Sequence, residues 1–235
     1  SGQFTQLLVP YFEQIVATDL SSQQLHQAPY FENVSYQVQQ AEQTSFNDHS
    51  FDLITVAQAI HWFDFDSFYA EVKRTLKSEG VLAVIGYGLI GVEDVPLNQH
   101  IQYLYTEFLS GYWDSERKHI DHAYQSIPFP FEELSSSNLE MQFNWTAEQL
   151  IGYLNTWTGL KHYREKNTNL KKDPLSDLTA YLAQSDELIQ VKFPIFLRIG
   201  KLKLTEKNKK MSKTKAQMSE MLKRVSVGFK EFVTV

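Results

Sequence analysis

The sequence contains no cysteine, so it can form neither a disulfide nor a zinc site with thiolate ligands. No apolar run approaches the roughly 20 residues that a membrane-spanning helix needs. The opening residues also lack the basic start and the apolar core of a secretory signal. These absences favour a chain without a membrane span that works in the cytoplasm, and we expect that location.

Sequence motifs of several enzyme classes are missing as well. There is no nucleophile elbow, no Walker lysine motif and no pair of carboxylates with a credible shared site, so hydrolysis and phosphoryl transfer have no support. No second histidine follows His61 at the four-residue spacing of a metal motif, and His100, His119 and His122 are scattered. We therefore expect no metal.

Charge is divided unevenly between a body and a tail. The net charge is −6, yet residues 201–235 hold ten Lys or Arg and three Glu, a balance of +7, so residues 1–200 carry −13. Because phosphate binding requires a basic face, the acidic body argues against nucleic acid as a partner. In the tail, apolar residues from Met211 to Phe232 fall on one helical face. This amphipathic helix could dock on the body, contact a partner or an acidic membrane surface, or be a foreign segment.

Strand and helix patterns alternate over the first 88 residues. Apolar runs predict strands at 14–20, 34–38, 51–60 and 81–85, and helical spacing predicts helices at 4–12, 22–28 and 66–76, the last one stopped by residues 77–80. The alternation predicts an α/β fold with a Rossmann-like, doubly wound and mostly parallel sheet that has helices on both faces.

After residue 88 this rhythm changes. Residues 89–137 hold an aromatic-rich helix and a proline-punctuated loop, which we interpret as an inserted helical cap. Thr146 and Gln149 form a capping box, and Pro194 within a strand at 191–199 predicts an edge position. We expect four parts, namely an α/β half at 1–88, the cap at 89–137, the remainder of the α/β domain at 138–200 and the tail at 201–235.

Asp19 closes the predicted strand at 14–20. A carboxylate at that place can accept hydrogen bonds from both hydroxyls of a ribose, and Asp19 stands 17 residues after Gly2, near the roughly 20-residue spacing of a nucleotide-binding motif. Asp19 could equally cap the helix that begins near Ser21. The glycine-rich turn of such sites is mostly absent, because the chain opens at Ser1 and Gly2 with no strand before them.

The segment 57–64 is the most informative one, because its apolar strand runs into His61, Trp62 and Phe63. Ligand crevices in open α/β sheets lie outside the carboxyl ends of the strands. We therefore expect His61 and Trp62 to line a pocket, although a lone histidine is more often a surface or core residue. A neutral imidazole can act there as a base or as a hydrogen-bond acceptor.

Two further segments carry polar groups that suit a ligand. Gln40-Ala41-Glu42 follows the strand at 34–38 and could contact an adenine edge, although an ordinary loop explains it as well. Arg117, close to Tyr112 and Trp113, could hold a carboxylate through its two parallel donors. The alternative is a solvated helix end where Arg117 pairs with a glutamate.

Together these residues resemble the class I S-adenosylmethionine-dependent methyltransferases, and in particular the type 11 group that includes trans-aconitate methyltransferase-like proteins. The segment 57–64 is the most specific match, and the likeness extends to about residue 202. The resemblance implies a seven-stranded sheet with an antiparallel last strand. Its first strand and most of its glycine motif are missing here, so we expect a chain that starts at Ser1 to bind the cofactor weakly or to misfold.

The resemblance also implies roles for individual residues. S-adenosyl-L-methionine would bind to the half at 1–88, and the cap at 89–137 would cover the substrate. The residues expected at the cofactor are Ser1, Gly2, Asp19, Leu20, Gln40, Ala41, Glu42, Ala57 and Gln58. The residues expected at the substrate are His61, Trp62, Tyr87, Tyr112, Trp113 and Arg117, with His61 as the candidate catalytic base.

The resulting hypothesis is methyl transfer to an oxygen, or less readily a nitrogen, of a small molecule. A carboxylate acceptor is already ionised and needs no strong base, whereas a hydroxyl acceptor would use His61. Two alternatives stay open. One is an NAD(P)-dependent oxidoreductase, which would also use Asp19 for a ribose, and the other is a catalytically inactive protein with the methyltransferase fold.

Overall fold

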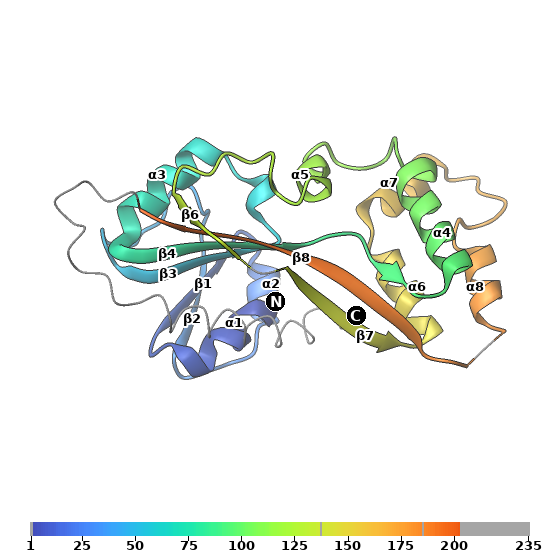
Figure 1. Cartoon of the computed structure of the whole chain (residues 1–235), viewed down its shortest axis with the longest axis horizontal. Coiled ribbons are helices and arrows are strands. Elements are labelled where there is room, and N and C mark those ends of the chain that lie inside the picture. Colours follow the sequence, from blue (N-terminus) through green and yellow to red (C-terminus); the bar gives the residue numbers. More distant parts are fainter. Residues whose placement is uncertain (1, 137, 185, 203–235) are drawn as a thin grey trace.

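The strands form two separate sheets in the computed structural model, which describes residues 2–136, 138–184 and 186–202. The smaller sheet, drawn in blue in Figure 1, pairs β1 (Ile15–Asp19) in parallel with β2 (Val34–Val38). The larger sheet consists of β3 (Phe51–Ala57), β4 (Leu76–Tyr87), β5 (Gly91–Val92), β6 (Glu132–Leu134), β7 (Leu139–Trp145) and β8 (Ile189–Lys201).

Strand β8 is reversed relative to every other strand of the larger sheet in the described residues. It pairs in antiparallel fashion with β4, β5, β6 and β7, and β3 is parallel to β4. The other five strands therefore run in one direction. This arrangement confirms the expected α/β fold with a mostly parallel sheet and a reversed last strand.

The two sheets are not joined by a strand within the described part of the chain. There β1 pairs only with β2, and β3 pairs only with β4 on its side of the larger sheet. The expected seven-stranded sheet is thus interrupted at the place where the resemblance puts its first strand.

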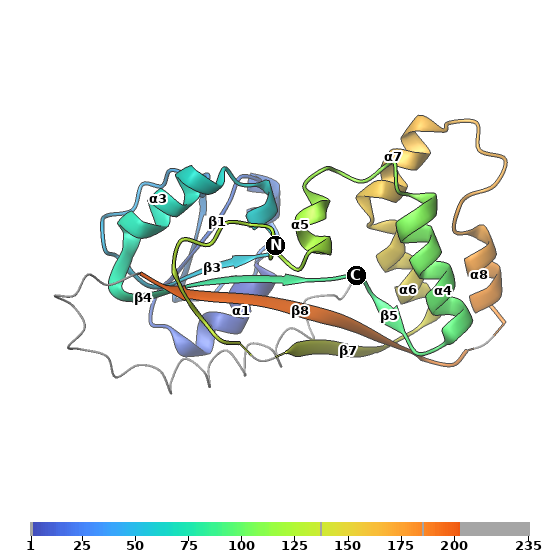
Figure 2. The ribbon, with the colours of Figure 1, turned by 45° about the horizontal axis from the view of Figure 1, so that its top comes forward.

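The helices gather at the two ends of β8. Helices α4, α6, α7 and α8 lie around one end, α3 lies over the end where β3 and β4 pair, and α5 lies between these groups (Figure 1, Figure 2). The helices are α1 (Gln3–Leu8), α2 (Ser22–His26), α3 (Phe65–Thr75), α4 (Val95–Tyr103), α5 (Arg117–Asp121), α6 (Ala147–Asn155), α7 (Thr158–Lys166) and α8 (Ser176–Leu182).

Short polar side chains begin several of these helices, as the sequence predicts. The capping box of α6 is present, because Thr146 accepts from the backbone of Gln149 and the Gln149 side chain accepts from the backbone of Thr146. Asp64 caps α3 by accepting from the Ser67 backbone at 2.9 Å. Such caps satisfy donors that a helix start leaves unpaired, and each contributes about 1 kcal/mol.

Three predicted details are wrong. Residues 77–80 do not stop α3 as a loop, because the chain passes directly from α3 into β4, and the fully buried Leu76 already pairs with Phe51. The strand that begins at Phe51 ends at Ala57 rather than at residue 60. Pro194 does not lie on an edge strand, since β8 has β4 on one side and β7 on the other. Proline has no N–H for the ladder, and Pro194 is tolerated because it lies just beyond the last residue pair between β4 and β8, Tyr87 with Ile195.

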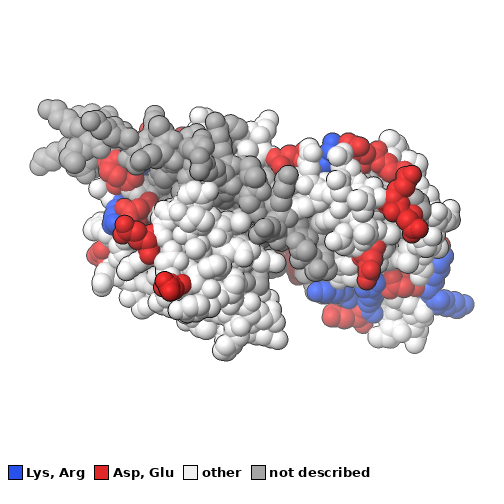
Figure 3. All heavy atoms as spheres, turned by 90° about the horizontal axis from the view of Figure 1, so that it is seen from below, with Lys and Arg blue, Asp and Glu red and all other residues white. Residues whose placement is uncertain are grey.

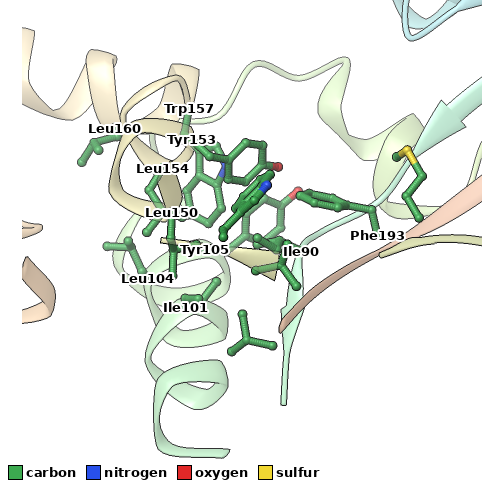
Figure 4. Packing of buried hydrophobic residues seen from close by; sticks show 14 of the residues in the cluster. Ile90, Ile101, Leu104, Tyr105, Leu150, Tyr153, Leu154, Trp157, Leu160 and Phe193 are labelled. Carbon is green, nitrogen blue, oxygen red and sulfur yellow. The ribbon is translucent and has the colours of Figure 1, made fainter. Parts of the chain in front are cut away.

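Two hydrophobic clusters form the core. The larger cluster packs α4, α6 and α7 against β8, and Figure 4 shows the rings of Tyr105, Tyr153, Trp157 and Phe193 meeting there. The smaller cluster packs α3 onto β3 and β4 and includes Tyr124, which is fully buried. Full burial of one such apolar side chain contributes about 1.5–3 kcal/mol. The boundary between the two clusters is where α5 and the end of β3 lie.

The described surface shows no sign of an extended basic area on the face in Figure 3. There, basic and acidic side chains lie next to each other at the helical end, and much of the remaining described surface is uncharged. Every helix in the described ranges is too short or too polar to reach across a bilayer. The amphipathic tail helix that the sequence predicts falls in residues 203–235, which lie outside the described residues.

Candidate active site

The end of β3 is tied to the end of β4 by one side chain. Gln58, with a positive φ of 52°, accepts a hydrogen bond from the Tyr87 backbone at 2.9 Å and donates to the Tyr87 carbonyl at 3.4 Å. The Gln58 amide thus extends the ladder between the two strands beyond Ala57. This link fixes the point from which the chain turns into the short 3-10 helix Ile60–Trp62.

That short helix turns His61 inward and Trp62 outward. His61 is 6% exposed, whereas Trp62 is 56% exposed. The Nδ1 atom of His61 lies 3.2 Å from the hydroxyl of Tyr124, and the two rings stack with their centroids 5.9 Å apart. The imidazole is therefore held on one side, while Trp62 remains open to solvent.

His61 is neutral at physiological pH. Burial, with smaller contributions from the charges of Arg117 and His119 and against an opposing effect of Glu116, lowers its pKa to about 4. A charged imidazole would lose its hydration inside the protein, so the neutral form is preferred. A neutral ring presents one nitrogen as a donor and the other as an acceptor.

Arg117, the first residue of α5, is held by aromatic rings. Its guanidinium lies 5.1 Å from the ring centre of Tyr105 and 4.8 Å from that of Trp113. Its Nε donates to the Tyr105 hydroxyl at 2.7 Å, and that hydroxyl donates to the carboxylate of Asp121. Burial raises the pKa of Tyr105 to about 12, so the phenol keeps the proton that it shares with Asp121.

Several N–H donors of the Arg117 guanidinium have no partner among the described residues. In the described part of the chain Arg117 forms no ion pair with a carboxylate, and neither of its terminal nitrogens has a protein hydrogen-bond partner. The proposed pairing of Arg117 with a glutamate is therefore not present in the structure. A guanidinium that is fixed through Nε but free at its fork is arranged to bind an anion through two parallel bonds.

An open cleft of about 740 Å³ lies beside this guanidinium. Two of the predicted substrate residues, Trp113 and Arg117, line it. The remaining lining residues are Gly88, Leu89, Tyr105, Thr106, Ser110, Asp114, Ser115, Lys118, Ile120, Asp121, Pro194 and Phe196. Its size is in the range of small-molecule sites.

The other predicted substrate residues do not line this cleft. His61 and Trp62 follow the end of β3. The positive charge of Arg117, which lines the cleft, is close enough to His61 to lower the pKa of the imidazole. Tyr87 packs edge-on against Phe193 at 5.7 Å. Tyr112 packs against Tyr163 at 5.0 Å. Those two tyrosines therefore have structural contacts of their own.

Asp19 lies at the carboxyl end of β1, as predicted. Its Oδ1 accepts from the Ser21 backbone at 2.8 Å, so it does support the start of α2, while the residue remains exposed. Leu20 beside it is 73% exposed. Asp19 and Leu20, both expected at the cofactor, are therefore exposed side chains at the carboxyl end of β1.

The loop after β2 contacts the segment that follows His61. Glu42 accepts from the Asp64 backbone at 3.2 Å, and Ala41 packs against the core cluster around α3, while Gln40 is exposed. The loop is therefore fixed beside the segment that follows His61. At the other end, Gly2 has a positive φ of 72°, and a Cβ there would lie 2.8 Å from that of Ala28. Ser1 lies outside the described residues.

Sequence reasoning missed three residues of this region. Tyr105 and Asp121 position Arg117, and Tyr124 contacts His61. A tyrosine in an aromatic-rich stretch of sequence is expected to pack in the core. No rule of spacing distinguishes Tyr105 and Tyr124, which also form hydrogen bonds with polar side chains, from tyrosines that only pack. In the described ranges, no three His, Asp or Glu side chains come together as metal ligands would.

Comparisons with known proteins were made with this geometry in hand. The family model described as "Methyltransferase domain" matches residues 1–84. A Dictyostelium discoideum protein named a putative methyltransferase is 32% identical over 210 residues, which cover 86% of this chain and 79% of that protein. An uncharacterized methyltransferase of Bacillus subtilis is 31% identical over 102 residues, 40% of each chain.

A solved structure extends this similarity to the whole fold. It is that of a putative type II methyltransferase from Anaeromyxobacter dehalogenans, with 35% identity, a TM-score of 0.77 and coverage of 86% of both chains. The oxidoreductase and the inactive binding protein that the sequence left open find no support in these matches. The chain belongs to the class I S-adenosylmethionine-dependent methyltransferases.

Proposed function

We propose that the methyl acceptor is a carboxylate oxygen of a small organic acid, bound by Arg117. S-adenosylmethionine-dependent methyl transfer follows from the family, and the identity of the acceptor is the proposed part. The observation that carries the proposal is the guanidinium of Arg117, which is fixed by Tyr105 and Trp113 at the edge of a cleft yet has no carboxylate partner among the described residues.

The organisation around Arg117 supports anion binding over a structural role. A structural arginine in this chain looks different: Arg164 is paired with Asp173 through two hydrogen bonds of 2.7 and 2.9 Å. Arg117 instead donates a hydrogen bond to the protein only through Nε, and the neighbouring aromatic rings hold the plane of its guanidinium. Because the geometry is set before the ligand arrives, little conformational entropy is lost on binding.

The neutral state of His61 supports an acceptor that is already ionised. With a pKa of about 4, His61 is a weak base, and taking a proton from a hydroxyl with a pKa near 10 or above would be unfavourable by about 8 kcal/mol. A carboxylate requires no such step, because its oxygen carries the negative charge at neutral pH. His61, which does not line the cleft, is then not needed as a proton acceptor.

The residues that would hold the cofactor are those at the ends of β1, β2 and β3. Asp19 would bind the ribose, Leu20 and the loop 40–42 would contact the adenine, and the backbone at Ala57 would lie along the nucleoside. When bound, S-adenosylmethionine supplies a methyl group on a sulfonium, which a carboxylate oxygen can attack directly. The protein's part is to align this oxygen and to exclude water from it.

A panel of matched acids and amides tests the proposal. The full chain is incubated with S-adenosylmethionine that carries a labelled methyl group and with pairs of aliphatic and aromatic compounds that differ only in carboxylate against primary amide. We expect label in the acids alone, as methyl esters that mild base hydrolyses. Base-stable label in hydroxyl or amine compounds, with none in the acids, would contradict the carboxylate assignment while leaving methyl transfer intact.

A further inference from the structure

A buried tyrosine holds the imidazole of His61 from behind. Tyr124 has no exposed surface, and its hydroxyl lies 3.2 Å from Nδ1 of His61. It follows Ala123, and both residues have positive φ values of 60° and 49°, in a region that side-chain-bearing residues rarely adopt. Such conformations persist only where the surroundings impose them, and they cluster at functional sites.

The surroundings do impose this position. The ring of Tyr124 lies on Gly86 of β4, so closely that a Cβ at residue 86 would come within 2.5 Å of the tyrosine Cε2. The edge of Phe196 on β8 meets the same ring at 5.9 Å. With β4 beneath it and His61 beside it, the ring has no room to move toward the sheet.

The backbone of Tyr124 is held by Arg198. This arginine of β8 is 8% exposed, and its Nη1 donates to the carbonyls of Tyr124 at 3.0 Å and Ile127 at 2.7 Å. Its other nitrogens donate to Glu133 at 2.8 and 2.9 Å, and its plane lies 4.4 Å from the ring centre of Phe129. A buried cation that makes these four hydrogen bonds ties the segment 124–133 to the sheet.

We propose that Tyr124 is a positioning residue that fixes the tautomer and the orientation of His61, and that Arg198 holds Tyr124 in place for this task. A phenol hydroxyl can donate or accept, and in this proposal Tyr124 donates to Nδ1 of His61, so that Nε2 carries the proton of the neutral ring. The opposite nitrogen, Nε2, then has a defined role as donor. The importance of this arrangement for catalysis rests on the proposed function, whereas the arrangement itself does not.

The nitrogen chemical shifts of His61 test the proposal without any substrate. ¹⁵N NMR at neutral pH reports the ratio of the two tautomers of the neutral ring, and a His61→Gln variant identifies the signals. In Tyr124→Phe, which keeps the ring and loses the hydroxyl, we expect this ratio to change about fivefold, as one lost hydrogen bond implies. The charged or titratable neighbours Arg117, His119 and Glu116 are unchanged in this variant.

The chain offers a matched control in the same segment. Tyr69 donates its hydroxyl to the Pro128 carbonyl at 2.6 Å and does not contact His61. Tyr69→Phe therefore loosens the segment by one hydrogen bond and should leave the tautomer ratio of His61 unchanged. Equal shifts in the two variants, or no shift in Tyr124→Phe, would overturn the role of Tyr124.

Arg198 is tested through an effect at a distance. Arg198→Gln should move the tautomer ratio in the same direction as Tyr124→Phe, although Arg198 does not touch His61. If that variant does not fold, Glu133→Gln removes only the ion pair, and a smaller shift in the same direction is expected. An unchanged ratio in whichever variant folds would overturn the role of Arg198. Because none of these spectra depends on methyl transfer, a failure of the proposed function gives a different result from a failure of this inference.

Discussion

Tyr105 holds Arg117 in two ways at once. The phenol accepts a 2.7 Å hydrogen bond from Nε, and the face of its ring lies 5.1 Å from the guanidinium carbon. The two contacts act on different parts of the same plane, so they fix both its position and its tilt. The terminal nitrogens of Arg117 have no protein hydrogen-bond partner in the described residues, which is the basis of the first prediction.

Arg117→Lys should weaken binding of the acid acceptor and spare the cofactor. Lysine keeps the charge but loses the planar fork and the Nε bond. We expect the KM for the acid to rise about tenfold or more, with an unchanged Kd for S-adenosylmethionine measured by titration calorimetry. Lys166, which lies 5.3 Å from the ring of Tyr112 outside the cleft, supplies the control variant Lys166→Gln. A similar rise in both variants would speak against a specific anion site.

Asp19→Asn should weaken cofactor binding more than it weakens the fold. The asparagine oxygen can still accept from the Ser21 backbone, so the start of α2 is kept, while the charge and one ribose acceptor are lost. We expect the Kd for S-adenosylmethionine to rise about tenfold or more. Ser21→Ala removes the other cap of α2, the bond from the Gln24 backbone at 3.2 Å, and serves as the control. If Asp19 does no more than cap the helix, both variants will change stability alone.

His61→Ala should lower turnover more than cofactor affinity. We expect the side chain, which follows the end of β3, to act on the substrate side of the site, and its removal leaves a small cavity beside Tyr124. We expect kcat to fall by about tenfold or more, with a Kd for the cofactor close to that of the unchanged protein. Equal losses in kcat and in cofactor affinity would place His61 on the cofactor side instead.

The stability of the protein should fall as the pH drops below about 6.5, because of His61. Its pKa is about 4 in the folded protein and near 6.5 when unfolded, so in that range the unfolded chain binds the extra proton. This contribution to the free energy of unfolding is complete above the unfolded pKa and is lost toward the folded one, by about 2 kcal/mol between pH 7 and pH 5.

Denaturant titrations at the two pH values measure this loss. It should shrink in His61→Gln to the smaller loss that His119 contributes, because burial also lowers the pKa of His119. It should persist in full in His26→Gln, since His26 is exposed. The ion pair of Glu71 with Arg74 does not interfere, because it holds the pKa of Glu71 at about 2 and is lost only at more acidic pH. An unchanged pH dependence in His61→Gln would show that the imidazole is not the responsible group.

Gly86→Ala should destabilise the fold, because the added methyl group would meet the Tyr124 ring at 2.5 Å and that ring is fully buried. Overpacking of this kind costs about 1–3 kcal/mol. Gly111 has no atom within 4 Å of an added Cβ, so Gly111→Ala should stay within about 0.5 kcal/mol of the original free energy of unfolding. Chemical denaturation of both variants makes the comparison, and similar values would contradict the packing described here.

The elements that follow local rules were predictable from the sequence. Thr146 and Gln149 form their capping box and Val34–Val38 forms a strand because both depend on neighbouring residues alone. The apolar strand before His61 was also predictable, although it ends at Ala57 rather than at residue 60. The family resemblance added the reversed last strand, which no local pattern indicates.

The features that depend on distant partners were not predictable. Tyr124 adopts a left-handed conformation without a glycine, because Gly86, 38 residues earlier, provides the space and Arg198, 74 residues later, holds the backbone. Pro194 reads as an edge residue, and its tolerance in a central strand depends on β4 having ended there. The residues next to Tyr124 and Pro194 in the sequence therefore do not indicate either feature.

The position of β8 in the chain has a consequence for how the protein assembles on the ribosome. In the described residues β5, β6 and β7 have no strand partner other than β8, which is also the last strand to be synthesised. Translation proceeds at about 5–20 residues per second, so these three segments wait several seconds with unpaired backbone groups. Nascent chains of this protein should therefore gain protease resistance late, in one step, once residue 201 has left the exit tunnel.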